Sequence, residues 1–206
     1  MALVKLNNRG VRSVTDFGGT TALGTYTFIK KITASSSSTV SFVDGSSSVV
    51  LDDTYKEYLF TFKNIHPSAS DPFFEINFSI DSGSNYNVAI TSSLWVAYHN
   101  EGGSATGLVY NSSHDSAQDT DGTRILTSQG NGNDESFSGY MYLFNPSSTT
   151  FVKHFLTRVS EYGSTSYIYD FNSAGYGNTT SAIDAVQFAY NTGNIDAGII
   201  TLYGIN

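Results

Sequence analysis

The sequence predicts an all-β chain, an antiparallel β-sandwich of the jelly-roll kind with an extended N-terminal arm. Hydrophobic residues alternate with polar ones in many short runs, turn-forming residues separate these runs, and no segment shows helical periodicity of useful length. A length of 206 residues suits one large β domain with a short tail. We therefore expect an arm over residues 1–24 and a single β-sandwich domain over residues 25–206.

The arm differs from the rest of the chain because it is rich in glycine and poor in aromatic side chains. Its apolar and basic residues suit attachment to another surface or oligomerisation: Leu3, Val4, Leu6, Arg9 and Arg12. Polar residues interrupt the apolar start before the core of a signal peptide forms, so we expect no signal peptide. An edge strand followed by a loop of the same domain is an equal alternative for this segment.

Strand-like runs follow one another from residue 25 onward. The first half contains runs at 25–34, 39–43, 49–51, 55–65, 73–81 and 86–98. The run at 73–81 is the clearest, because Phe74, Ile76, Phe78 and Ile80 alternate with polar residues and define one apolar face. Polar turns separate the runs, and Pro67 ends the fourth one because it cannot donate to a strand ladder.

Residues 100–136 form the longest weakly patterned stretch, rich in glycine and with only short apolar patches. A loop of this length in a compact domain is usually functional or poorly ordered. Strand-like runs then resume at 137–144, 149–159, 167–171, 186–190 and 199–203. In the second of these, Phe151, Phe155 and Val159 share a face.

The composition excludes several classes of function. The chain has no cysteine, which excludes disulfides, thiolate nucleophiles and cysteine-ligated zinc. A net charge of −8 argues against binding to nucleic-acid phosphates. No apolar run approaches the roughly 20 residues that a membrane helix needs, so we expect no membrane insertion. Aromatic residues make up 14% of the chain, which is enough for a substantial core.

Candidate catalytic groups are sparse, and we expect a protein that is not an enzyme and binds no cofactor. The sequence lacks a Gly-x-Ser-x-Gly elbow, and its histidines are isolated, which favours structural roles for them. Glu57 and Glu75 lie in consecutive predicted strands, and glycan cleavage needs two carboxylates across one sugar. A solvated strand face is the favoured interpretation of both glutamates, and we predict no catalytic residues.

One segment resembles the start of a calcium-binding loop. Residues 119–122 read Asp-Thr-Asp-Gly, but the EF-hand pattern requires a glutamate where the chain has Gly130. A second oxygen-rich group follows at 131–135. Calcium in the 100–136 loop is an open alternative, but a solvated turn is favoured, and we predict no metal site.

Sugar binding is suggested by tyrosines in or beside Gly/Ser-rich segments: Tyr162, Tyr167, Tyr169 and Tyr176. Exposed tyrosines among serines and asparagines make adaptable contact surfaces. The alternative, favoured by the periodicity of this strand, is that its alternating tyrosines belong to the core with their hydroxyls at the edge.

Several segments resemble virion proteins of marine tailed bacteriophages of the cyanophage type. The resemblance covers almost the whole chain and is carried by residues 1–15 (MALVKLNNRGVRSVT), 54–58 (TYKEY), 65–67 (IHP), 130–136 (GNGNDES), 143–154 (LFNPSSTTFVKH), 178–185 (NTTSAIDA), 193–198 (GNIDAG) and 202–205 (LYGI). These proteins are known mostly as structural or tail-associated components, and they carry no agreed catalytic motif.

The resemblance implies a non-enzymatic structural component of a phage particle, either an exterior appendage or a capsid decoration protein attached through its N-terminal arm. A receptor- or carbohydrate-binding tail-fibre module is the alternative, and a glycan depolymerase ranks third. The expected partners are other virion proteins, further copies of the chain in a homotrimer, and a host surface glycan. The expected location is the virion, after synthesis in the host cytoplasm.

Overall fold

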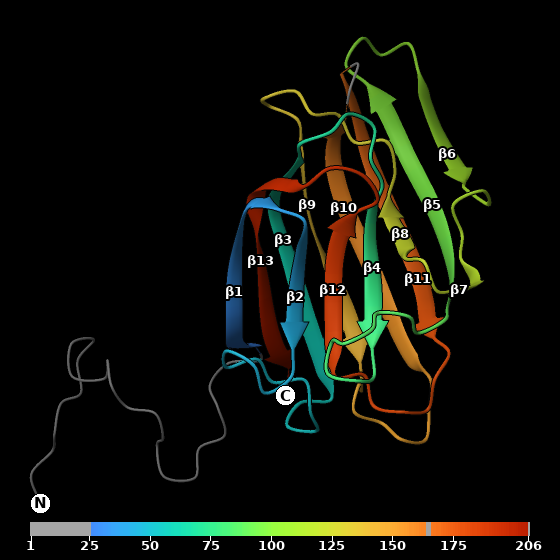
Figure 1. Cartoon of the computed structure of the whole chain (residues 1–206). Coiled ribbons are helices and arrows are strands. Elements are labelled where there is room, and N and C mark those ends of the chain that lie inside the picture. The colour runs from blue at the N-terminus through green and yellow to red at the C-terminus, as the bar shows by residue number, and fades with distance from the viewer. Residues whose placement is uncertain (1–25, 164–165, 206) are drawn as a thin grey trace, which may run out of the picture.

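The computed structural model describes residues 26–163 and 166–205, which form β-strands and no α-helix (Figure 1). The strands are β1 (Tyr26–Ser37), β2 (Thr39–Val43), β3 (Glu57–Pro67), β4 (Phe74–Ser79), β5 (Ile90–Asn100), β6 (Thr106–Tyr110), β7 (Ala117–Asp119), β8 (Thr123–Leu126), β9 (Ser136–Phe144), β10 (Lys153–Gly163), β11 (Tyr167–Gly177), β12 (Ala185–Tyr190) and β13 (Ile195–Ile205). The predicted all-β antiparallel sandwich is confirmed. The predicted arm over residues 1–24 lies outside the described residues.

The strands form two antiparallel sheets packed face to face. The large sheet has the order β1-β13-β3-β9-β10-β11-β5-β6, with β7 also paired to β5, and the small sheet has the order β2-β12-β4-β8. The chain passes repeatedly from one sheet to the other, for example from β1 to β2 and back to β3, as in a jelly roll. Figure 1 shows the small sheet in front of the large one.

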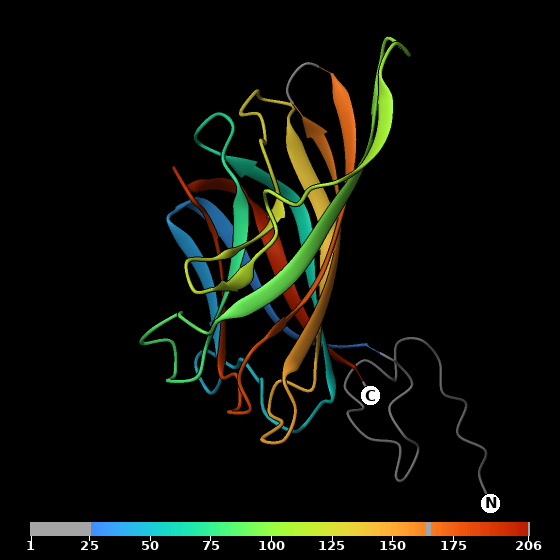
Figure 2. The same cartoon turned by 90° about the vertical axis from the view of Figure 1, so that its right-hand side faces the viewer.

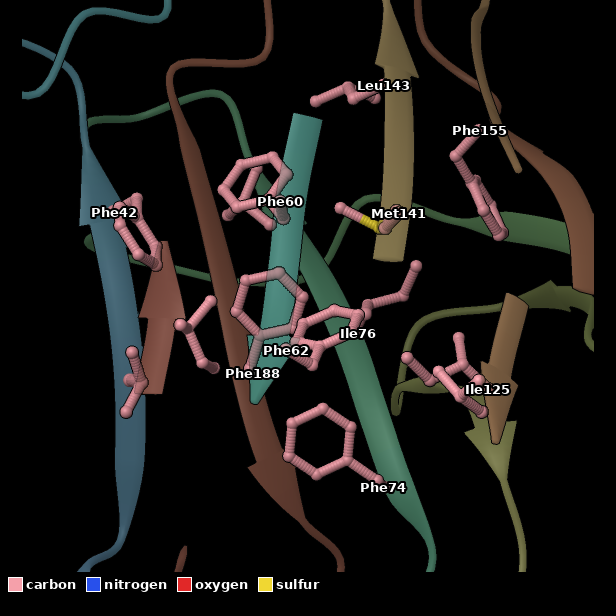
Figure 3. Packing of buried hydrophobic residues seen from close by; sticks show 14 of the residues in the cluster. Phe42, Phe60, Phe62, Phe74, Ile76, Ile125, Met141, Leu143, Phe155 and Phe188 are labelled. Atoms are coloured by element: carbon pink, nitrogen blue, oxygen red, sulfur yellow. The ribbon is translucent and has the colours of Figure 1, made fainter. Parts of the chain in front are cut away.

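The core fills the space between the sheets with interlocking aromatic rings (Figure 3). Phe188 of β12 lies 5.2 Å from Phe62 and 5.3 Å from Phe60 between ring centroids, both edge to face. Phe74 of β4 meets Phe137 of β9 at 4.9 Å. Edge-to-face pairs at such distances add to the stabilisation gained from burying the rings.

The alternation predicted for residues 73–81 holds for Phe74, Ile76 and Phe78, which are fully buried, but fails at Ile80. Ile80 is exposed because β4 ends at Ser79, whose buried hydroxyl donates to the Asp81 carboxylate in the turn that follows. Phe151 is likewise exposed, because β10 begins only at Lys153. The alternation of side chains between the two faces of a strand therefore does not predict burial for apolar residues that lie just beyond a strand end.

The weakly patterned stretch 100–136 contains three short strands, β6, β7 and β8. Two of them extend the large sheet at its β5 edge, and the third completes the small sheet. The β5–β6 hairpin rises beyond the end of the small sheet, at the upper right of Figure 2. In residues 26–163 and 166–205, no helix is long and apolar enough to span a bilayer.

Candidate binding face

The large sheet has one face against the small sheet and one face away from it, which we call the outer face. Eight of the eleven exposed large hydrophobic residues of the described chain lie on the outer face: Tyr26, Phe28, Trp95, Leu108, Tyr110, Tyr140, Leu156 and Ile168. Concentration of exposed apolar side chains on one face is typical of an interaction surface. The outer face is therefore the candidate functional site.

One half of the outer face is an aromatic patch formed by Tyr26, Phe28, Tyr142, Phe144 and Tyr203 on β1, β9 and β13. Phe28 lies edge to face with Tyr203 at 6.1 Å, and Tyr142 stacks on Phe144 at 6.1 Å. A hydrogen bond with Tyr26 raises the pKa of Tyr142 to about 12. The patch begins at the first described residue of the chain.

The other half carries a row of residues that runs across five neighbouring strands, which we call the cross-strand row. The strand register places its members directly beside one another: Tyr110 of β6, Trp95 of β5, Asn172 of β11, Arg158 of β10 and Tyr140 of β9. Neighbouring strands lie about 4.8 Å apart, so the row is about 19 Å long. It combines aromatic rings near its ends with hydrogen-bonding groups at its centre.

A bidentate ion pair lies at the centre of this row and fixes the position of Arg158. Arg158 Nε and Nη2 donate to the two carboxylate oxygens of Asp170 at 2.9 and 2.8 Å. Such parallel bonds fix the plane of the guanidinium group. Next to the pair lies an open hollow of about 460 Å³, lined by Ser138, Gly139, Tyr140, Arg158, Ser160, Ile168 and Asp170. A hollow of this size is within the range of small-molecule sites, roughly 300–1,000 Å³.

The four tyrosines singled out in the sequence do not share one surface. Tyr162 and Tyr176 lie on the outer face, at opposite ends of the β10–β11 hairpin. Tyr167 and Tyr169 lie on the inner face, where their rings stack at 5.6 Å and both approach Tyr98 of β5. Tyr169 packs against the hydrophobic core. Of these four residues, the structure therefore brings only Tyr167 and Tyr169 into contact with each other.

The two glutamates considered for glycan cleavage also lie apart. Glu57 of β3 lies on the outer face beside Phe144. Glu75 of β4 lies on the solvent side of the small sheet, where Arg124 Nε approaches its carboxylate at 3.7 Å. Burial raises the pKa of Glu75 to about 7, against the opposing effect of Arg124. The two carboxylates are on opposite sides of the sandwich and cannot act on one sugar.

The calcium-like segment forms a turn in which the Asp119 carboxylate accepts a hydrogen bond from the Asp121 backbone N–H at 3.0 Å. The described residues contain no group of three or more histidine, aspartate or glutamate side chains arranged to hold a metal ion. His66 and His114 bond oxygens of nearby loops, the backbone carbonyl of Glu135 and the side chain of Asn111, both at 2.7 Å. These histidines hold loops in place, as their isolation in the sequence suggested.

Two ionisable residues of β10 are buried in the sandwich. Lys153 Nζ donates to the backbone carbonyls of Phe151 and Thr179, and burial lowers its pKa. Glu161 is fully buried, and neither carboxylate oxygen has a hydrogen-bonding partner among the described residues. Burial raises the pKa of Glu161 to about 8, with a further contribution from the charges of Glu135 and Asp71.

The chain matches no protein family model, no curated protein and no solved structure. Sequence reasoning missed the residues of the cross-strand row, because a row across strands depends on the register between segments far apart in the chain. The alternation of Leu94, Trp95 and Val96 was the one local indication, since it points Trp95 away from the core.

Proposed function

We propose that the chain is a non-enzymatic structural subunit of a tailed-phage particle, mounted on its exterior as an appendage or capsid decoration and attached through its N-terminal arm. The aromatic patch on the outer face carries this proposal. Exposed aromatic clusters of this kind are usually covered in an assembly. Because the patch begins at Tyr26, directly after the arm, one partner surface can bind both.

The composition and the resemblance give further support. The segments that resemble phage virion proteins extend from residue 1 to residue 205, and they include the arm. Charged residues make up only 14% of the chain, and its polarity comes mainly from serine, threonine and asparagine. Such a surface suits a subunit that packs against other proteins without strong electrostatic repulsion.

The partner surface that we propose for the aromatic patch is another copy of the chain in a homotrimer. Cyclic association buries the patch of each copy against a neighbour and closes without leaving an open end. It also covers β1, which is an edge strand of the large sheet in the part of the chain that the structure describes; an uncovered edge is open to pairing with other chains.

Replacing the two most exposed aromatic residues of the patch is expected to abolish assembly. The double variant Tyr26→Ser/Phe28→Ser removes rings that are 52% and 59% exposed, so the fold itself is retained. Light scattering after size exclusion should give the trimer mass for the wild type and the monomer mass for the variant. Particles carrying the variant gene should contain less of the protein.

Leu108→Ser is the matched control, because Leu108 is 71% exposed on the same face but at the opposite edge of the sheet. It should leave both trimer and incorporation unchanged. A monomeric wild type at micromolar concentration, or equal incorporation of the double variant, would rule out the patch as the assembly surface.

A further inference from the structure

The cross-strand row has the chemistry of a carbohydrate subsite. It shares no residue with the aromatic patch, although Tyr140 at its end lies edge to face with Tyr142 of the patch at 5.5 Å. Trp95 and Tyr140 are 41% and 38% exposed, so each ring is held against the sheet while part of it faces solvent. A pyranose ring presents C–H groups on its faces and hydroxyl groups around its edge. Aromatic rings contact the faces, and charged or amide groups bond the hydroxyls.

The hollow beside the row supplies both kinds of contact in one place. Tyr140 and Ile168 line it with apolar groups, while Arg158, Asp170, Ser138 and Ser160 line it with donors and acceptors. The Arg158–Asp170 pair is fixed by its two hydrogen bonds, and Asn172 donates to the same carboxylate at 3.3 Å. A preorganised polar group loses little entropy when it binds a hydroxyl.

The charge of the row indicates which glycans fit. The positive charge of Arg158 is balanced by Asp170, and the other members of the row are uncharged. The whole chain carries a net charge of −8, so a polyanionic glycan would be repelled. A neutral oligosaccharide meets no such cost, and the row, about 19 Å long, offers contacts to several sugar units in sequence.

We infer that the cross-strand row, from Tyr110 to Tyr140, binds a neutral, linear glycan chain laid across β6, β5, β11, β10 and β9. One sugar unit occupies the hollow between Tyr140 and Ile168, where Arg158 and Asp170 bond its hydroxyl groups. Trp95 contacts the face of another unit further along the row. This inference adds a ligand to the proposed structural role and does not depend on it.

The chain contains a single tryptophan, so its fluorescence reports directly on the row. The test titrates the purified full chain with a panel of neutral tetrasaccharides of glucose, galactose and mannose, and with tetragalacturonate as the charged counterpart. We expect at least one neutral tetrasaccharide to change Trp95 emission saturably and to protect it from acrylamide quenching. Tetragalacturonate should have no such effect.

Variants inside and outside the row show whether the tetrasaccharide binds at the row. Tyr140→Ala and Arg158→Ala should each weaken binding about tenfold, as expected for the loss of a central contact. Phe28→Ala, which removes a more exposed aromatic ring outside the row, should leave binding unchanged. The inference is overturned if no neutral tetrasaccharide affects Trp95, if tetragalacturonate binds as tightly, or if Phe28→Ala weakens binding as much as Tyr140→Ala. Since the readout is made on the isolated chain, none of these outcomes bears on whether the chain is part of a particle.

Discussion

Replacing Gly139 by alanine is expected to destabilise the sandwich by about 3 kcal/mol, which lowers the melting temperature by roughly 6–12 °C. Gly139 lies in β9 opposite Val159 of β10. A β-carbon built at this position would lie 2.3 Å from the backbone oxygen of Arg158 and 2.7 Å from the α-carbon of Val159. Both are backbone atoms, so the two strands must separate to relieve the overlap.

Thermal unfolding followed by circular dichroism measures this effect, with Gly102→Ala as the control. Gly102 lies in the turn between β5 and β6, where an added β-carbon meets no atom closer than 3.8 Å. The control should unfold within a degree or two of the wild type. If Gly139→Ala is equally stable, then β9 and β10 are not as close as the structure places them, and the position of Tyr140 beside Arg158 is also in doubt.

Glu161 is expected to lower the free energy of unfolding by an amount that grows as the pH rises. The pKa of this carboxyl is about 8 in the folded chain, against 4.5 for the ordinary group. Below pH 4.5 the group is protonated in both states and has no effect. Between pH 4.5 and 8 the unfolded chain ionises while the folded chain does not, so this group lowers the free energy of unfolding by about 1.4 kcal/mol per pH unit.

The variant Glu161→Gln removes the titration and should therefore gain stability over the wild type as pH rises. The free energies of unfolding of variant and wild type should differ least near pH 5. By pH 8 the free energy of unfolding of the variant should have risen relative to that of the wild type by up to about 4 kcal/mol. Urea unfolding at several pH values measures this difference directly. The comparison between variants isolates Glu161 from other carboxyls, such as Glu75, that also titrate.

Thr157→Val is the control for the pH series. Thr157 is buried at an inward position of the same strand, and its hydroxyl likewise lacks a partner among the described residues. Neither threonine nor valine titrates, so any change in the free energy of unfolding should be the same at every pH. A pH-independent difference between Glu161→Gln and the wild type would contradict the burial of an uncharged carboxyl at this position.

Local alternation was enough to predict the fold class. Tyr58, Phe60 and Phe62 share one face in the sequence, and all three lie in the core. Alternation failed where strands ended early, as at Ile80 and Phe151, because turn geometry there depends on side-chain bonds such as that of Ser79 to Asp81. It also missed β6 to β8, which are short strands. Of these, β7 and β8 pair with segments far away in the chain, whereas β6 forms a hairpin with β5.

The candidate site was much harder to predict, because it depends on which strands are neighbours. Trp95, Arg158 and Tyr140 are up to 63 positions apart in the chain (158 − 95 = 63) and meet only through the register of β5, β11, β10 and β9. The tyrosines at 167 and 169 illustrate the reverse case. Their alternation favoured a place in the core over an exposed surface, and in the structure both lie on the inner face, with Tyr169 packed against the core.

Quantitative mass spectrometry of purified phage particles tests whether the chain is a structural part of the particle. The number of copies per particle is measured against the major capsid protein. We expect the chain to be present in a multiple of three, with hundreds of copies for a capsid decoration and a few to a few dozen for a tail or neck appendage. Absence of the chain from purified particles would contradict the structural role.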